Sequence, residues 1–193
     1  MNELELCVKS NVSFDKLIKI MKDRGFHIQE DFQMNDIYMI KKEEKISFKN
    51  RNNILNDYLL IRETVGKRIM LILKHKEIND KNEIVNQKSV KCPITDINKG
   101  YDFLVALNYK KMFELKDHNV LLSNGKNEIY IQNVEKLGTY IEMEQKNLLL
   151  ENNNGNNIDE MIDILNSYDL PFNKNNYFVK KSEDMLKMID ESL

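Results

Sequence analysis

Two segments far apart in the chain alternate carboxylates with apolar residues. Glu3 and Glu5 lie in ELELCVK near the N-terminus, and Glu142 and Glu144 lie in GTYIEME. Strict alternation is typical of a β-strand, in which alternate side chains share one face at a spacing of about 6.6 Å. Each segment is therefore expected to form a strand with one apolar face and one face of carboxylates.

Two interpretations of these carboxylate faces are open. A half-exposed antiparallel strand alternates in the same way with its charges in water, and for either segment alone this is the simpler interpretation. If both strands enter one sheet with the charged faces together, four carboxylates converge. Such a cluster needs a divalent cation or a facing set of lysines and arginines.

The first half of the chain predicts one helix and several strands. Between Ser13 and Gly25, apolar residues recur at helical spacing, and these two residues are expected to cap the helix. The stretch 41–56 is charged and rich in asparagine, which favours a mobile loop. Apolar runs between polar breaks predict strands at 26–32, 36–41, 57–64 and 68–76.

The second half echoes the first. The same offset separates Val8 from Val90 and Lys9 from Lys91, and each pair precedes a predicted helix followed by two strands. This repeat predicts one domain, 1–193, made of two strand-helix-strand-strand halves at about 1–85 and 86–193. A flexible break is expected at 152–157, then a helix capped by Asn157 and an amphipathic segment at 182–191.

Composition narrows the class of protein. The chain has 193 residues, a net charge of -2 and a pI near 6.0, which disfavours binding to nucleic acid through bulk charge. It has no apolar run of about 20 residues and no signal-peptide pattern, so no membrane partner and a cytoplasmic location are expected.

The cysteines and histidines show no catalytic or metal-ligand spacing. Cys7 and Cys92 are expected to be buried free thiols without a disulfide. His27, His75 and His118 are isolated, which favours surface or packing roles.

Basic residues occupy alternate positions on strands between the two carboxylate segments. Any one of them is simplest to explain as an edge lysine or, for Arg62, as a surface partner of Glu63 or Asp57. Taken together, they make a charge-compensated interior that would suit a triphosphate with its cation. The candidate phosphate ligands from this pattern are Lys9, Arg62, Lys74, Lys76 and Lys116.

Several of these segments resemble one known family. ELELCVK, the NDIY after the first helix, LIRE, ILKHK and above all VEKLGTYIEME are similar to motifs of the CYTH superfamily, which includes class IV adenylate cyclases and thiamine triphosphatases. The resemblance covers nearly the whole chain in order, and the VEKLGTYIEME block is its most specific part.

The resemblance implies an α+β fold, an eight-stranded antiparallel β-barrel flanked by helices whose tunnel binds a triphosphate. It implies that Glu3, Glu5, Glu142 and Glu144 hold Mg²⁺ or Mn²⁺. It also implies phosphate contacts from Arg62 and Lys74, and from Lys181 near the tunnel mouth.

Several charged positions of the family pattern are altered in this chain. The lysine of the N-terminal E-x-E-x-K motif is replaced by Cys7, and the first arginine of R-x-R is replaced by Leu60. Gln132 stands where the family often has aspartate, and Gln87-Lys88-Ser89 stands where it commonly has R-x-E. Losing several phosphate ligands would abolish turnover or change the substrate.

Three functional hypotheses follow. The first is a metal-dependent enzyme acting on ATP or another organic triphosphate, either as a cyclase or as a triphosphatase, although no residue stands out as a general base. The second is a degenerate module that binds a phosphorylated ligand without turnover, and the third is a structural domain. A homodimer is left open.

Overall fold

The computed structural model describes residues 5–78, 84–144 and 158–192. Within these residues, eight strands and five α-helices follow one another along the chain, with one short 3₁₀ helix, η1. In chain order they are β1 (Glu5–Lys9), α1 (Phe14–Asp23), β2 (His27–Lys41), η1 (Phe48–Asn50), α2 (Arg51–Asn56), β3 (Asp57–Thr64), β4 (Arg68–Ile78), β5 (Ile84–Ile94), α3 (Ile97–Ala106), β6 (Tyr109–Ser123), β7 (Glu128–Val134), β8 (Gly138–Glu144), α4 (Ile158–Ser167) and α5 (Lys181–Glu191).

The strands form one antiparallel sheet in the order β1-β8-β7-β6-β2-β3-β4-β5. The α+β class expected from the sequence is therefore confirmed. The number of strands, eight, is also the number that the family resemblance implies.

The closed barrel implied by the resemblance is not confirmed, because β1 and β5 end the strand order and do not pair with each other in the part of the chain described. The outer edge of β1 has another partner. The Cys7 N–H donates to the Tyr177 carbonyl at 3.0 Å, and the Val179 N–H donates to the Cys7 carbonyl at 2.8 Å. With its backbone groups used in this way, Cys7 has none left for a further strand at that position.

The chain divides into two compact units that interleave in the sequence. Unit 1 contains Glu3–Phe32 and Asp117–Lys180, and unit 2 contains Gln33–Lys116 and Lys181–Leu193. Each unit therefore draws on both of the sequence halves that the repeat predicts.

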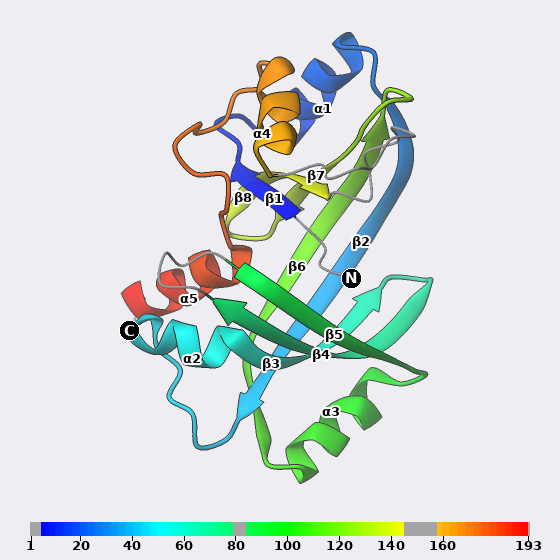
Figure 1. Cartoon of the computed structure of the whole chain (residues 1–193). Helices are drawn as coiled ribbons and strands as arrows, with labels where there is room; N and C mark the ends of the chain where they lie inside the picture. Colours follow the sequence, from blue (N-terminus) through cyan, green and yellow to red (C-terminus); the bar gives the residue numbers. More distant parts are fainter. Residues whose placement is uncertain (1–4, 79–83, 145–157, 193) are drawn as a thin grey trace. The chain divides into compact units, whose positions relative to one another are not determined.

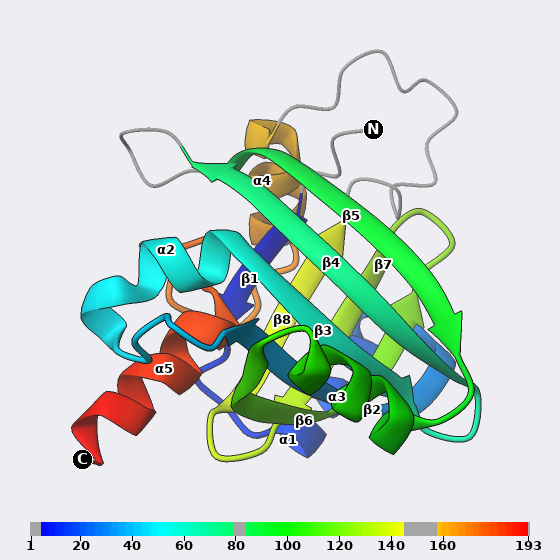
Figure 2. The same ribbon diagram turned by 90° about the horizontal axis from the view of Figure 1, so that it is seen from below.

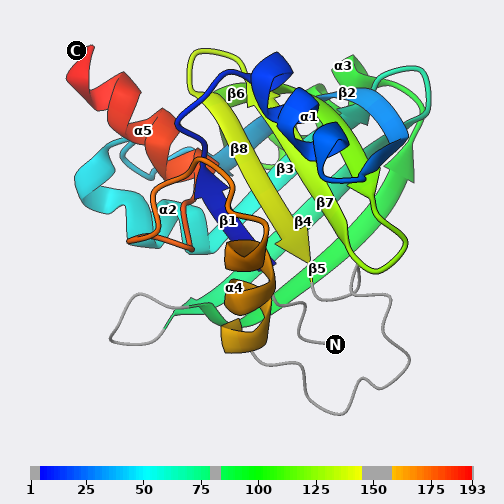
Figure 3. The same cartoon turned by 90° about the horizontal axis from the view of Figure 1, so that it is seen from above.

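Unit 1 packs α1 and α4 against one face of its strands (Figures 1 and 3). Apolar residues at alternate positions supply that face, including Ile141 and Met143 on β8, and they meet Leu17 of α1 and Met161 of α4. All four are fully buried. Because side chains alternate along a strand, Glu142, which lies between Ile141 and Met143, projects to the opposite face.

Unit 2 packs α3 against β3 (Figure 2). Leu104 of α3 meets Ile61 of β3 and Met39 of β2 in a second apolar cluster. Gly100 permits the close approach of this helix, since a Cβ there would lie 2.6 Å from Ile94 Cδ1. The Asp96 side chain caps α3 by accepting a hydrogen bond from the Lys99 N–H at 3.0 Å.

The structure corrects three local expectations. The strands predicted at 26–32 and 36–41 are one strand, β2, and the predicted mobile loop at 41–56 contains η1 and α2. That segment is ordered because Ile54 and Leu55 are buried. Ser13 lies at the N-cap of α1 but its side chain makes no capping hydrogen bond.

The expected break at 152–157, with its Asn157 cap, lies outside the described residues. No described helix combines the length and the apolar character needed to cross a membrane.

Candidate functional site

Three carboxylates gather on the face of unit 1 that lies opposite its helices. Ile141 and Met143 point into the apolar cluster, so Glu142 and Glu144 project from the other face of β8. β1 pairs with β8 in a register that sets Glu5 opposite Glu144. The alternation noted in the sequence therefore brings these side chains together.

The turn before β8 sets the register between β7 and β8. The Leu137 N–H donates to the Val134 carbonyl at 3.1 Å, and Val134 pairs with Gly138. Lys136 and Gly138 both have positive φ, at 68° and 94°. A shift of one residue would turn Glu142 to the apolar face, so the turn fixes which side chains form the site.

One carboxylate oxygen from each of Glu5, Glu142 and Glu144 lies within 4.8 Å of the other two. Glu142 is 8% exposed, Glu144 is partly buried and Glu5 is exposed. The cluster therefore runs from the protein interior to the surface. Like charges at this separation repel one another, most strongly where burial reduces solvent screening.

The donor set fits a hard divalent cation. Mg²⁺ binds oxygen at about 2.1 Å in octahedral geometry, so two of its ligands lie about 3.0 Å apart when adjacent and about 4.2 Å apart when opposite. The oxygens of the cluster are at most 4.8 Å apart, slightly more than the separation of two opposite Mg²⁺ ligands. A change of rotamer in one glutamate can close this difference. The three carboxylates can accordingly act as monodentate ligands of one ion, with positions left for water or phosphate oxygens.

Lys9 lies on the same face of β1 as Glu5. It pairs with Tyr140, and its ammonium lies 5.4 Å from the centre of the Tyr140 ring. Tyr140 is fully buried while Lys9 is exposed. Of the basic residues predicted from the sequence, Lys9 is the one in unit 1, and the cation–π contact sets the direction of its side chain.

Arg62 in unit 2 is held by a carboxylate that the sequence prediction missed. Its Nε donates to Asp36 Oδ1 at 2.7 Å and its Nη2 to Asp36 Oδ2 at 2.5 Å. Asp36 is opposite Arg62 in the β2–β3 register, and their side chains are 6% and 29% exposed. The partner shown by the structure is thus Asp36, which was not among the expected surface partners Glu63 and Asp57. Asp36 belongs to the NDIY segment, and its alternation with Tyr38 is the sequence pattern that could have placed it on this face of the strand.

Lys74 and Lys76 lie on the same face of unit 2 as Arg62. Lys74 pairs with Tyr58, which alternates with Arg62 along β3. Lys76 extends over the Tyr58 ring, with 5.6 Å from its ammonium to the ring centre. Lys91 of β5 joins them by register, because it pairs with Ile72. The sequence prediction missed Lys91, although its match to Lys9 in the internal repeat was visible.

Lys116 and Lys181 are placed differently. Lys116 is exposed and lines a pocket of about 310 Å³ with Glu63 and Ile61. These two residues alternate with Arg62 on β3, so Lys116 lies toward the opposite face of that strand. Lys181 is the first residue of α5.

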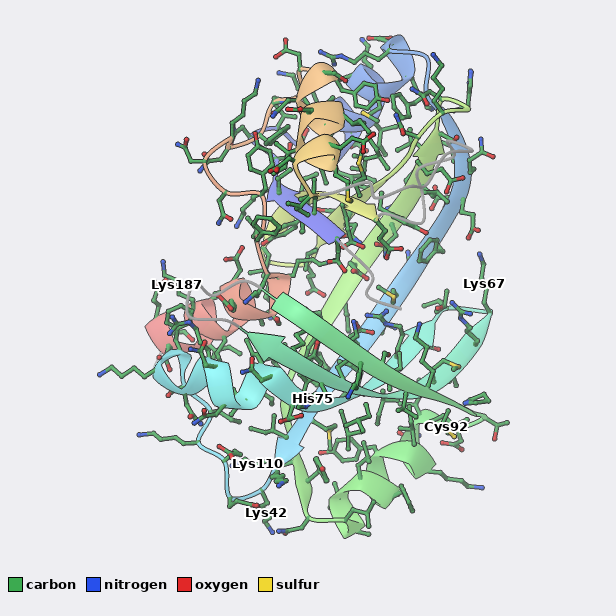
Figure 4. The ribbon with its side chains drawn as sticks, viewed as in Figure 1. Lys42, Lys67, His75, Cys92, Lys110 and Lys187 are labelled. Atoms are coloured by element: carbon green, nitrogen blue, oxygen red, sulfur yellow. The ribbon has the colours of Figure 1, made fainter. Side chains whose placement is uncertain are left out.

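The two cysteines and two of the histidines are placed by the structure. Glu3 lies outside the described residues. Cys7 is a buried free thiol as expected, whereas Cys92 is free but exposed, because it lies on β5 at the end of the strand order (Figure 4). His75 pairs with Asp57 at 2.5 Å, and His118 pairs with Asp31 at 2.7 Å, both on partly exposed surfaces.

The fold matches solved structures over nearly the whole chain. The PH1819 protein from Pyrococcus horikoshii aligns with a TM-score of 0.69 and 20% identity over 96% of this chain and 99% of its own. A candidate adenylate cyclase from Vibrio parahaemolyticus aligns with a TM-score of 0.67 and 13% identity over 96% and 98%.

The chain shares the fold of these solved structures. A conserved hypothetical protein from Pyrococcus furiosus also aligns, with a TM-score of 0.64 and 14% identity over 90% of this chain and 96% of its own. No protein-family profile matches the sequence, and no curated protein matches it. The shared fold is thus shown by structural similarity, whereas the sequence carried only short motifs.

Proposed function

We propose that this CYTH-like protein binds an organic triphosphate together with Mg²⁺ or Mn²⁺. The observation that supports the proposal best is the cluster of Glu5, Glu142 and Glu144, whose oxygens lie within 4.8 Å of one another. Three carboxylate oxygens gathered in this way form the set of hard ligands that Mg²⁺ and Mn²⁺ prefer.

A metal–triphosphate complex also requires basic side chains. Three carboxylates more than neutralise one divalent ion, so a triphosphate that joins it must meet positive charge elsewhere. Lys9 of unit 1 is the proposed phosphate ligand on the strand that carries Glu5. Lys74, Lys76 and Arg62 remain proposed phosphate ligands within unit 2, and we add Lys91 to that proposal because it shares their face of the sheet. The fold shared with a candidate adenylate cyclase is consistent with this ligand class.

Two reactions suit such a complex. In a cyclase the ribose 3′-hydroxyl attacks the α-phosphorus and pyrophosphate leaves, and in a triphosphatase water attacks the γ-phosphorus and orthophosphate leaves. In either reaction the cation stabilises negative charge that develops on the phosphate oxygens.

A second candidate function is binding without turnover. It is favoured by the commitment of Arg62 to Asp36, because a guanidinium that already holds a carboxylate bidentately has fewer donors for a phosphate. The neutral residues Cys7, Leu60 and Gln132 at positions where the family pattern is charged favour it too.

One set of incubations tests both candidates. Purified protein is mixed with ATP, GTP, thiamine triphosphate or tripolyphosphate and either Mg²⁺ or Mn²⁺, and the products are analysed for cyclic nucleotide, pyrophosphate and orthophosphate. Thermal unfolding is measured in the same mixtures. Metal-dependent stabilisation by a triphosphate without any product would support the binding module, and product formation would support the enzyme.

Two further results would overturn the proposal itself. The first is the absence of any metal-dependent stabilisation or product in every mixture. The second is an unchanged metal response in the double variant Glu142→Gln with Glu144→Gln.

A further inference from the structure

A buried amide outside the carboxylate cluster has no hydrogen-bond partner for its nitrogen among the described residues. Asn119 of β6 is 1% exposed, and its Nδ2 is the atom concerned. Folded proteins pair nearly all of their buried polar groups, because leaving one unpaired costs the full free energy of removing it from water. An unpaired buried donor is therefore a candidate contact for a ligand or an ordered water.

Asn119 shares a face with the carboxylate cluster. Its neighbours Val120 and Leu122 are in the apolar core of unit 1, so Asn119 projects to the opposite face of β6. The register places Asn119 opposite Gln132, and Gln132 opposite Tyr140. A row of uncharged polar side chains thus crosses β6, β7 and β8 beside the position of Glu142.

The distance between Asn119 and Glu142 indicates separate roles for them. Two strand spacings of about 4.8 Å and one two-residue step of about 6.6 Å place their Cα atoms roughly 12 Å apart. Asn119 is therefore too far away to bind the same cation as Glu142. An elongated ligand held by the cation at one end would lie within reach of Asn119 at its other end.

The charges near Asn119 indicate which part of a ligand it would meet. Asp117 precedes it on the same face of β6 and is 9% exposed, so a negative phosphate is disfavoured there. Gln132 and Tyr140 offer hydrogen bonds without formal charge, and the positive charge of Lys9 lies at the far end of this row, three strands away from Asn119. Such surroundings suit a hydroxyl or carbonyl group better than a phosphate.

We infer that Asn119 is a specificity-determining residue that donates a hydrogen bond to a neutral oxygen of the organic part of the triphosphate. This inference rests on the proposed function and adds to it a reason for preferring an organic triphosphate over inorganic tripolyphosphate. The unpaired amide is a cost of the ligand-free protein that binding of the correct ligand removes.

Asn119→Leu tests the inference, since leucine has nearly the same volume and no polar atoms. Thermal unfolding is measured without ligand, with Mg²⁺ and tripolyphosphate, and with Mg²⁺ and whichever of ATP, GTP and thiamine triphosphate stabilises the wild type most. We expect the ligand-free variant to unfold at an equal or higher temperature than the wild type. The affinity for the organic triphosphate should fall about tenfold, and that for tripolyphosphate should stay unchanged.

Asn127→Leu is the matched control, because Asn127 is also a buried asparagine of unit 1 with one unpaired amide atom, its Oδ1, but its donor group is occupied: Nδ2 donates to Tyr168 Oη at 2.7 Å. This variant should be less stable than the wild type without any change in ligand preference. Asn119→Ala, which adds no volume, serves as a second variant in case leucine prevents folding, and the same loss of organic triphosphate affinity is expected from it.

The outcomes separate this inference from the proposed function. Equal affinity of the wild type for tripolyphosphate and for all three organic triphosphates would overturn the inference alone, as would an unchanged preference in both Asn119 variants. A parallel loss of affinity for both ligand types would show a structural role and overturn it as well. If the wild type binds no triphosphate with either metal, the proposed function fails and the inference fails with it.

Discussion

The metal-dependent stability of unit 1 is the quantity that the carboxylate cluster controls most directly. With an effective dielectric constant of about 20, two unit charges 4.8 Å apart repel by roughly 3.5 kcal/mol, which gives the scale of the repulsion within the cluster. A cation bound between them offsets this repulsion. The ion should therefore stabilise the folded protein, by an amount that rises with the logarithm of its concentration above the dissociation constant.

The expected size of the effect follows from binding linkage. A cation at about 100 times its dissociation constant adds roughly 2.7 kcal/mol to the free energy of unfolding. In a chain of this length, each kcal/mol raises the melting temperature by about 2–4 °C, so saturating Mg²⁺ or Mn²⁺ should raise it by roughly 5–11 °C. Glu142→Gln keeps the shape of the side chain and removes its charge, and it should abolish most of this increment.

The assay is thermal unfolding of wild type and variant across a titration of each metal, with a chelator as the zero point. Glu135→Gln makes the same chemical change in the exposed turn before β8 and should keep the full increment. A metal increment retained in Glu142→Gln, or lost in Glu135→Gln, would refute the assignment of the cluster as the metal site.

Three other perturbations test the geometry of the two units. Asp36→Asn leaves Arg62 without its carboxylate and should lower the free energy of unfolding in urea by about 2–3 kcal/mol, while adding Arg62→Met should restore part of it; no recovery would argue against the ion pair. Val179→Pro removes the N–H that bonds to Cys7 and should cost about 1–3 kcal/mol beyond Val179→Ala, and equal hydrogen exchange of β1 in both variants would count against this edge contact. Lys74→Met should weaken stabilisation by tripolyphosphate, measured calorimetrically, and leave the metal response alone; an unchanged affinity would exclude it as a phosphate ligand.

The strand content of the site could be read from the sequence because alternation is a local property. In GTYIEME the apolar residues Ile141 and Met143 must be buried, and the two glutamates then follow on the other face whatever the sheet contains. The same logic placed Glu5 and Lys9 on one face of β1. Helix α1 could be predicted for a similar reason, since its apolar residues recur at the helical period.

Local patterns failed where distant segments decide the outcome. The segment 41–56 is polar enough to predict a mobile loop, yet it contains α2, because Ile54 and Leu55 find apolar surface to cover. Arg62 could be seen as a basic strand residue, but only the β2–β3 register identifies Asp36 as its partner. The covering of the β1 edge at Cys7 likewise depends on Tyr177 and Val179, which lie far along the chain from it.

The sequence by itself determined which residues face away from the core, and with that the carboxylates available to a cation. It did so because burying the alternate apolar side chains stabilises the fold far more than any particular placement of the charged side chains. Tertiary structure decided which of those charged and polar groups meet: Glu5 with Glu144 across β1 and β8, Arg62 with Asp36, and Asn119 buried beside Gln132. The register between strands and the packing of distant segments decide which residues meet, and neither can be read from a single segment.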